Sequence, residues 1–209
     1  GGESNGAAVG REDAIAFSDR STYAANVEMA AALPPTDPRP SPAETMMRID
    51  TPRQHTIEDL CAFLDVAPQQ TLKTLVVRAA NPEGEAEGVV ALALRGDHQL
   101  NPIKAARLPE VYAPLTLATE AEVVAAVGAP IGSIGPVDLA IPLIVDHAAA
   151  QLADFVCGAN TADQHLRGVN WERDVALPKV ADLRNVEEGD PSPDGQGTLH
   201  IKRGIEVGH

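Results

Sequence analysis

The chain has 209 residues, 44% of them hydrophobic, which is enough to bury one core of its own. Its 30 acidic and 16 basic residues give a net charge of -14, which argues against broad, sequence-independent binding to a nucleic-acid backbone but not against a small contact with a nucleic-acid end. Aromatic residues make up only 3%, which argues against base-stacking platforms.

The sequence has no features of a membrane or secreted protein. No apolar run reaches the roughly 18 residues that a membrane span needs, and the first residues lack a signal-peptide pattern. Cys61 and Cys157 share no short motif, so neither a disulfide framework nor a zinc site is indicated. We therefore expect a protein of the reducing cytoplasm.

The first third of the chain predicts irregular structure ahead of a compact domain. Alanines between residues 21 and 32 favour a short helix. Residues 33–42 are so rich in proline that they can form neither a helix nor a central strand. The compact domain is therefore expected to begin near Met46, and Thr56 with Asp59 predicts the start of its first helix.

The middle of the chain predicts a β-hairpin. Thr74–Arg78 is rich in β-forming residues, and Gly88–Arg95 is apolar at nearly every position, which is typical of a buried central strand. The polar segment 81–85 between them contains proline and glycine and reads as the turn.

Capping signals predict further helices between strands. Asn101 followed by Pro102 indicates an N-cap and first helical residue, and Thr119 with Glu122 forms a capping-box pattern. Later apolar runs over residues 141–145 and 155–157 indicate strands. The predicted fold is α+β or mixed α/β, with a central mixed β-sheet flanked by short helices.

No common catalytic motif is present. The sequence lacks a nucleophile elbow, a Walker loop, a dinucleotide-binding fingerprint and a His-Glu-x-x-His metal motif. The glycine-rich loop Gly128–Pro136 leaves backbone N–H groups uncovered, so it could hold an oxyanion or a carbonyl oxygen. The alternative is an ordinary tight connection between a helix and a strand. No metal site is expected.

Three side chains are further candidates, two of them with a structural alternative. Lys73 opens an apolar strand and could hold a phosphate, although a lysine at a strand end often only packs its aliphatic stem. Asp146 follows the strand 141–145, where an acid commonly caps a turn. His165 lies in an unusual run with Trp171, which is expected to anchor the core, and with the candidate ion pair of residues 173 and 174.

Together these segments resemble the editing (INS) domain of bacterial prolyl-tRNA synthetase, which is related to the freestanding YbaK-type aminoacyl-tRNA deacylases. The resemblance runs from about Phe17 to His209. The segments that carry it are Leu72–Val77, Leu94–Asn101, Gly132–Pro136, Gly168–Asp174 and Asp182–Val186, with Phe17–Glu28 and Ala181–His209 resembling the flanks of the insertion. The resemblance implies three parts: a leading segment 1–47 with the proline-rich linker, an editing domain 48–186, and a segment 187–209 that returns to the synthetase core.

The resemblance implies a function and a set of site residues. The function is hydrolysis of mischarged alanyl-tRNA(Pro) to alanine and free tRNA. The loop that cradles the ester corresponds to Gly132, Ser133, Ile134, Gly135 and Pro136. Lys73 corresponds to the essential lysine of the family, and Asp146 and His165 correspond to substrate-binding residues of the pocket.

A mechanism is expected on the same basis. Loop N–H groups would stabilise the oxyanion, and Lys73 would neutralise the phosphate of the terminal adenosine. Asp146 would recognise the α-ammonium group, His165 would set size selectivity, and the ribose 2'-hydroxyl would orient the water. Editing would need no cofactor, whereas the parent synthetase would use ATP and Mg.

The implied partners are the 3' CCA end of tRNA(Pro) carrying alanine and the remainder of a homodimeric synthetase chain, without a membrane. This chain lacks the class II synthetase motifs and is not expected to aminoacylate tRNA. Two alternatives stay open. The chain could deacylate tRNA carrying another wrong residue, cysteine or serine, or it could be a non-catalytic module that stabilises the parent synthetase.

Overall fold

The computed structural model describes residues 14–204, and the chain divides into two compact units. The smaller unit combines the segments up to Leu33 and from Asn185, and the larger unit spans Pro34–Arg184. Among the described residues, no helix is long and apolar enough to cross a membrane.

The smaller unit is a three-stranded antiparallel sheet built from both of its chain segments. Its strands are β1 (Ala14–Ser18), β2 (Ala24–Asn26) and β10 (Leu199–Arg203), with β1 in the centre. The helix expected over residues 21–32 is wrong, because Ala25 pairs with Ala16 of β1 in a strand. Alanine's helix propensity is a weak preference, and tertiary pairing overrides it here.

The larger unit holds the remaining strands and the helices. Its strands are β3 (Met47–Asp50), β4 (Leu72–Ala80), β5 (Ala86–Arg95), β6 (Leu143–Asp146), β7 (Phe155–Gly158), β8 (Gln164–Val169) and β9 (Lys179–Ala181). Its α-helices are α2 (Ile57–Leu64), α3 (Pro102–Ala106), α4 (Glu120–Val127) and α5 (His147–Ala150), with 3-10 turns η1 (Pro68–Gln70) and η2 (Ile131–Ser133).

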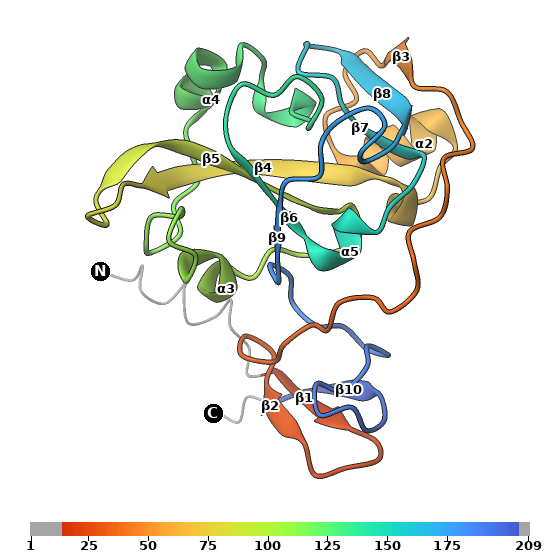
Figure 1. Ribbon diagram of the computed structural model, residues 1–209, viewed down its shortest axis with the longest axis vertical. Coiled ribbons are helices and arrows are strands. Elements are labelled where there is room, and N and C mark those ends of the chain that lie inside the picture. The colour runs from red at the N-terminus through yellow and green to blue at the C-terminus, as the bar shows by residue number, and fades with distance from the viewer. Residues whose placement is uncertain (1–13, 205–209) are drawn as a thin grey trace. The chain divides into compact units, whose positions relative to one another are not determined.

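A mixed four-stranded sheet forms the centre of this unit, in the order β4-β5-β6-β9. β4 and β5 make the predicted antiparallel hairpin, while β6 is parallel to both β5 and β9. Helices α3 and α4 lie on opposite sides of the hairpin (Figure 1), so its apolar residues are buried from both sides. The mixed sheet with short flanking helices confirms the predicted fold class.

A second, antiparallel sheet in the order β3-β8-β7 packs beside the first. An isolated bridge between Thr71 and Val156 connects the two sheets. Trp171 anchors the core between them, as expected: its Nε1 donates to the Ala149 carbonyl at 3.0 Å, and its ring lies 5.1 Å from that of Phe155. Both sheets therefore share one hydrophobic cluster.

The predicted helix caps are confirmed. The side chains of Thr56 and Thr119 each accept a hydrogen bond from the amide three residues on, at 3.0 and 3.1 Å. Asn101 Oδ1 accepts from two amides at the start of α3. Glu122 completes the capping box by accepting from the Thr119 amide at 2.8 Å. Local sequence signals thus fix where these helices begin.

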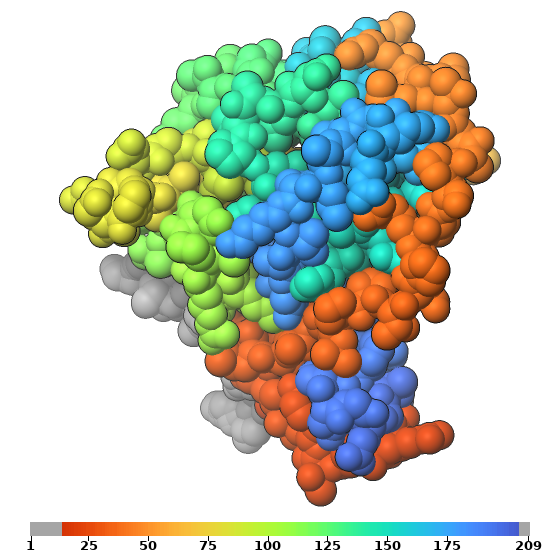
Figure 2. Space-filling view, in the orientation of Figure 1, coloured from red at the N-terminus to blue at the C-terminus, as the bar shows by residue number. Residues whose placement is uncertain are grey.

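The proline-rich segment contains no helix or strand up to β3, as expected. Figure 2 shows the segment, in orange, at the surface of the larger unit. Polar contacts hold it there: Arg39 Nε donates to the Ala150 carbonyl at 2.9 Å, and Gln151 Nε2 donates to the Asp37 carbonyl. Just after the segment, Arg173 donates to the Glu44 carbonyl at 2.7 Å. Arg173 also forms the expected ion pair with Asp174, at 2.9 Å.

Candidate active site

A pocket of about 210 Å³ opens beside the bridge that joins the two sheets. Elements of both sheets, helix α2 and the glycine-rich loop contribute to its walls. Its lining residues are His55, Thr56, Ile57, Leu60, Leu72, Lys73, Thr74, Leu75, Ile131, Gly132, Ile134, Gly158 and His165. The structure therefore brings together four of the residues that the sequence indicated: Lys73, Gly132, Ile134 and His165.

The loop presents two backbone donors to this pocket. The Ser133 amide donates to the Pro130 carbonyl at 2.9 Å, and the Gly135 amide donates to Asn160 Oδ1 at 2.9 Å. Within the described part of the chain, the amides of Gly132 and Ile134 donate to no protein acceptor. Because both residues line the pocket, these two amides can receive a carbonyl oxygen or an oxyanion. Ser133, Gly135 and Pro136 belong to the loop but do not line the pocket.

Close packing explains why the loop needs glycine at residue 135. A Cβ atom added to Gly135 would lie 1.9 Å from the Gly158 carbonyl oxygen. The reverse also holds, because a Cβ atom on Gly158 would lie 2.5 Å from the carbonyl oxygens of Ser133 and Ile134. The loop and the end of β7 can approach this closely only when both positions lack a side chain.

Lys73 brings positive charge to the pocket. It lies near the start of β4, opposite Leu94 of β5, and is half-buried. β4 is the edge strand of the central sheet, and its residues 72–75 line the pocket. A lysine ammonium group in this position can bind a phosphate as a compact point charge.

His165 forms an uncharged wall. It lies in β8 with only 5% of its surface exposed, and its Nδ1 is 2.5 Å from Thr51 Oγ1. Burial disfavours the charged imidazole and, with a smaller contribution from nearby His55, lowers the pKa of His165 to about 4. Its side chain is therefore neutral at physiological pH.

The structure does not bring Asp146 to this pocket. Asp146 is 1% exposed, and its two carboxylate oxygens accept from the amides of Ala148 and Leu183 at 3.0 and 2.9 Å. It is the N-cap of α5, which is the capping role that the sequence offered as the alternative. Burial raises the pKa of this carboxyl, although Arg184 lies 4.0 Å away. A substrate-binding role for Asp146 has no support in this geometry.

Two residues of the site went unnoticed in the sequence. Thr51 holds His165, and Asn160 holds the loop, but neither belongs to a recognisable motif. Asn160 did carry one signal, because asparagine tolerates the left-handed conformation that it adopts here, with a φ of 57°.

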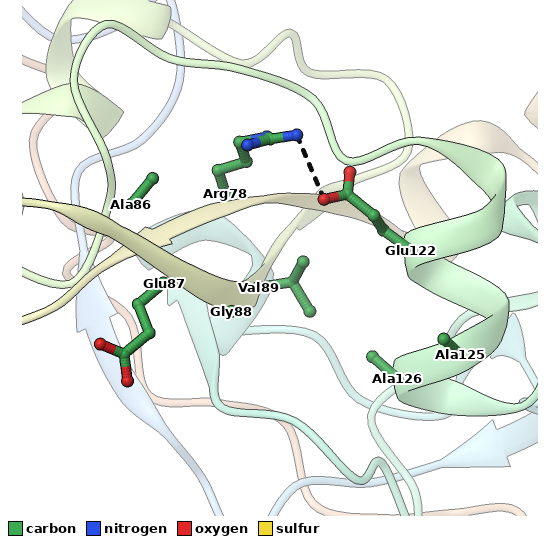
Figure 3. Close-up of a pocket in the computed structure, with 8 residues that line it drawn as sticks. All are labelled: Arg78, Ala86, Glu87, Gly88, Val89, Glu122, Ala125 and Ala126. Carbon is green, nitrogen blue, oxygen red and sulfur yellow. Dashed lines mark ion pairs between the residues drawn. The ribbon is translucent and has the colours of Figure 1, made fainter.

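A second hollow of about 350 Å³ lies between the β4–β5 hairpin and α4. In Figure 3, Arg78 and Glu122 point toward one another across it, and they form an ion pair at 3.2 Å. Small side chains make up much of the rest of its lining. None of the candidate site residues predicted from the sequence lines this hollow, and its one arginine is already paired with an acid, so we place the candidate site in the smaller pocket.

Comparison with known proteins agrees with this choice of pocket. Residues 51–175 match the family model described as aminoacyl-tRNA editing domain, and this range includes every residue that lines the pocket. A similar solved structure is that of the hypothetical protein APE2540, which is 26% identical with a TM-score of 0.54 over 68% of this chain and 92% of that one.

Two further solved structures share the fold at 23% identity, each over 68% of this chain. One, from work on epitope backbone grafting onto scaffold proteins, has a TM-score of 0.56 and is covered over 88% of its length. The other, named as a candidate trans-editing enzyme for prolyl tRNA synthetase, has a TM-score of 0.55 and is covered over 87% of its length.

Proposed function

Because the chain belongs to the aminoacyl-tRNA editing domain family, we propose that its pocket hydrolyses the ester bond of a mischarged aminoacyl-tRNA, and specifically of alanyl-tRNA(Pro). The products are the free amino acid and free tRNA. The observation that carries the proposal is the convergence of Lys73, His165 and two unbonded loop amides on one small pocket.

The loop supplies the electrostatic part of the reaction. Water attacks the ester carbonyl carbon, and negative charge develops on the carbonyl oxygen. The amides of Gly132 and Ile134 stabilise that charge, and one such donor typically contributes about 3 kcal/mol to the transition state. The bond to the ribose oxygen then breaks, and that oxygen takes up the proton that the attacking water loses. No enzyme nucleophile is needed, because the ester is already activated.

Lys73 positions the substrate. Its ammonium group neutralises the phosphate of the terminal adenosine and so places the ester carbonyl over the loop. The ribose 2'-hydroxyl orients the attacking water. We leave Asp146 out of the binding set, because its oxygens are engaged with backbone amides.

The pocket limits the size of the amino acid. A neutral His165 forms one wall of the pocket, and this wall restricts the side chains that the pocket admits. Editing of this kind is needed because a synthetase discriminates a missing methylene by only about 1–3 kcal/mol. Alanine, which enters the proline site of the synthetase, is thus the proposed target, and cysteine and serine are the alternatives of similar size.

We place the chain as the insertion domain of a cytoplasmic prolyl-tRNA synthetase, whose other parts would use ATP and Mg. The pairing of β1 with β10 supports this, because it holds the incoming and outgoing segments side by side, as an insertion requires. The net charge of -14 suits a domain that contacts only the 3' end of tRNA(Pro) and leaves the remaining phosphate contacts to the rest of the synthetase homodimer.

The direct test is deacylation of tRNA(Pro) charged with alanine, cysteine, serine or proline. We expect release of alanine and no release of proline. Faster release of cysteine or serine than of alanine would replace the proposed substrate with one of the alternatives. No hydrolysis of any ester, with the domain above the tRNA concentration, would favour the non-catalytic module.

A further inference from the structure

We propose that Asn160 is a positioning residue that shapes the glycine-rich loop into a two-donor oxyanion site. The inference rests on the proposed deacylase function. Asn160 does not line the pocket, so it acts through the loop rather than on the substrate. Its side chain and backbone together make four hydrogen bonds to the segment 133–137.

Each of these four bonds fixes a different part of the loop. Asn160 Oδ1 accepts from the Gly135 amide, and Nδ2 donates to the carbonyls of Gly135 and Val137, all at 2.9 Å. The Asn160 amide donates to the Ser133 carbonyl at 2.7 Å. The loop is thereby held on both sides of Ile134, and its backbone has little freedom to rotate.

The bonds also decide which amides stay available. Asn160 occupies the Gly135 amide, so this group cannot serve as an oxyanion donor. The Ser133 amide is engaged with Pro130. Among the described residues of the loop that line the pocket, the amides of Gly132 and Ile134 then remain available. Asn160 therefore selects the donors as well as their direction.

Asparagine suits the position for two physical reasons. The pattern needs one acceptor and two donors on one planar group, which an amide provides and a carboxylate does not. The backbone has a φ of 57°, a left-handed conformation in which asparagine is enriched. Asn160→Asp keeps the shape and the acceptor but replaces both donors with a charge that faces two carbonyls. Asn160→Gly keeps the backbone conformation and removes the side chain.

The test compares these variants with the unaltered chain in single-turnover and steady-state deacylation of alanyl-tRNA(Pro). We expect kcat to fall about 10- to 100-fold in both variants with KM changed less than 3-fold, because a displaced donor loses its effect on the transition state. Asn160→Asp should regain activity relative to the unaltered chain as pH falls from 7.5 to 5, since protonation restores one donor. Asn160→Gly should show no such recovery.

Asn81 provides the matched control. Its Oδ1 accepts from two amides and its Nδ2 faces two carboxylates in the β4–β5 turn, and it does not line the pocket. Asn81→Asp should leave kcat, KM and the pH profile unchanged.

Two different failures can be told apart. If the unaltered chain hydrolyses no aminoacyl-tRNA, the proposed function is wrong. If it does, and folded Asn160→Asp and Asn160→Gly keep kcat within 3-fold, the positioning role is wrong. Equal losses in kcat for the Asn81 control would also overturn it.

Discussion

Replacing Gly135 with alanine tests the loop geometry most directly. The new Cβ atom would lie 1.9 Å from the Gly158 carbonyl oxygen, whereas real contacts of this kind are essentially never below 3.0 Å. Because the obstacle is backbone, the loop must move by about 1 Å, and the amide of neighbouring Ile134 must move with it. Misplacement of this size costs on the order of 100-fold in rate.

The assay is single-turnover deacylation with the variant in excess over alanyl-tRNA(Pro). Thermal unfolding followed by circular dichroism measures the accompanying loss of stability, expected at about 1–3 kcal/mol from overpacking. Gly84→Ala is the control. Gly84 has a φ of 84°, so a side chain is strained there as well, but nothing lies within 4 Å of its added Cβ and no backbone has to move. A folded Gly135→Ala variant with at least half of the original rate would refute the assignment of the loop as the oxyanion site.

The remaining predictions concern single groups. Lys73→Ala should lower kcat/KM at least about 10-fold, the value of one charge-assisted contact, and unchanged rates would remove the lysine from the mechanism. Through His165, the free energy of unfolding should decrease by about 3 kcal/mol as pH falls from 6.5 toward 4, because the unfolded chain protonates this histidine while the folded chain keeps it neutral at a pKa of about 4. Urea titrations at several pH values should show that His165→Gln reduces this dependence of the unfolding free energy on pH. Asp146→Ala should cost about 1–3 kcal/mol in stability, because it leaves the buried Leu183 amide and the half-buried Ala148 amide unsatisfied, but should leave kcat/KM of the folded fraction unchanged. Burial raises the pKa of the Cys157 thiol, so a thiol reagent should modify it only after denaturation.

Local patterns predicted the elements of the larger unit well. The caps at Thr56, Asn101 and Thr119 and the hairpin turn depend on residues within a few positions of one another, and the structure confirms each of them. The helix expected over residues 21–32 was wrong because its alanines pair with a strand from elsewhere in the unit. Local preference decides structure only where no long-range partner competes.

The site was harder to predict for the same physical reason. Asn160 is 25 residues from Gly135, and Thr51 is 114 residues from His165, so no local spacing indicates either contact. Asp146 shows the opposite error, since a residue type suited to binding is used for capping. The sequence indicates which residue types can act, but only the fold shows which of them share a pocket.

The loop and the size-limiting wall of the pocket share one pair of strands. Gly158, against which the loop packs, pairs with His165 across β7 and β8, and the His165 side chain is held further by Thr51 ahead of α2. A substitution that shifts β8 would therefore disturb the oxyanion donors together with the amino-acid pocket, whereas a substitution of Thr51 acts first on the histidine side chain. The surroundings of Thr51 are thus the place to begin engineering a different selectivity.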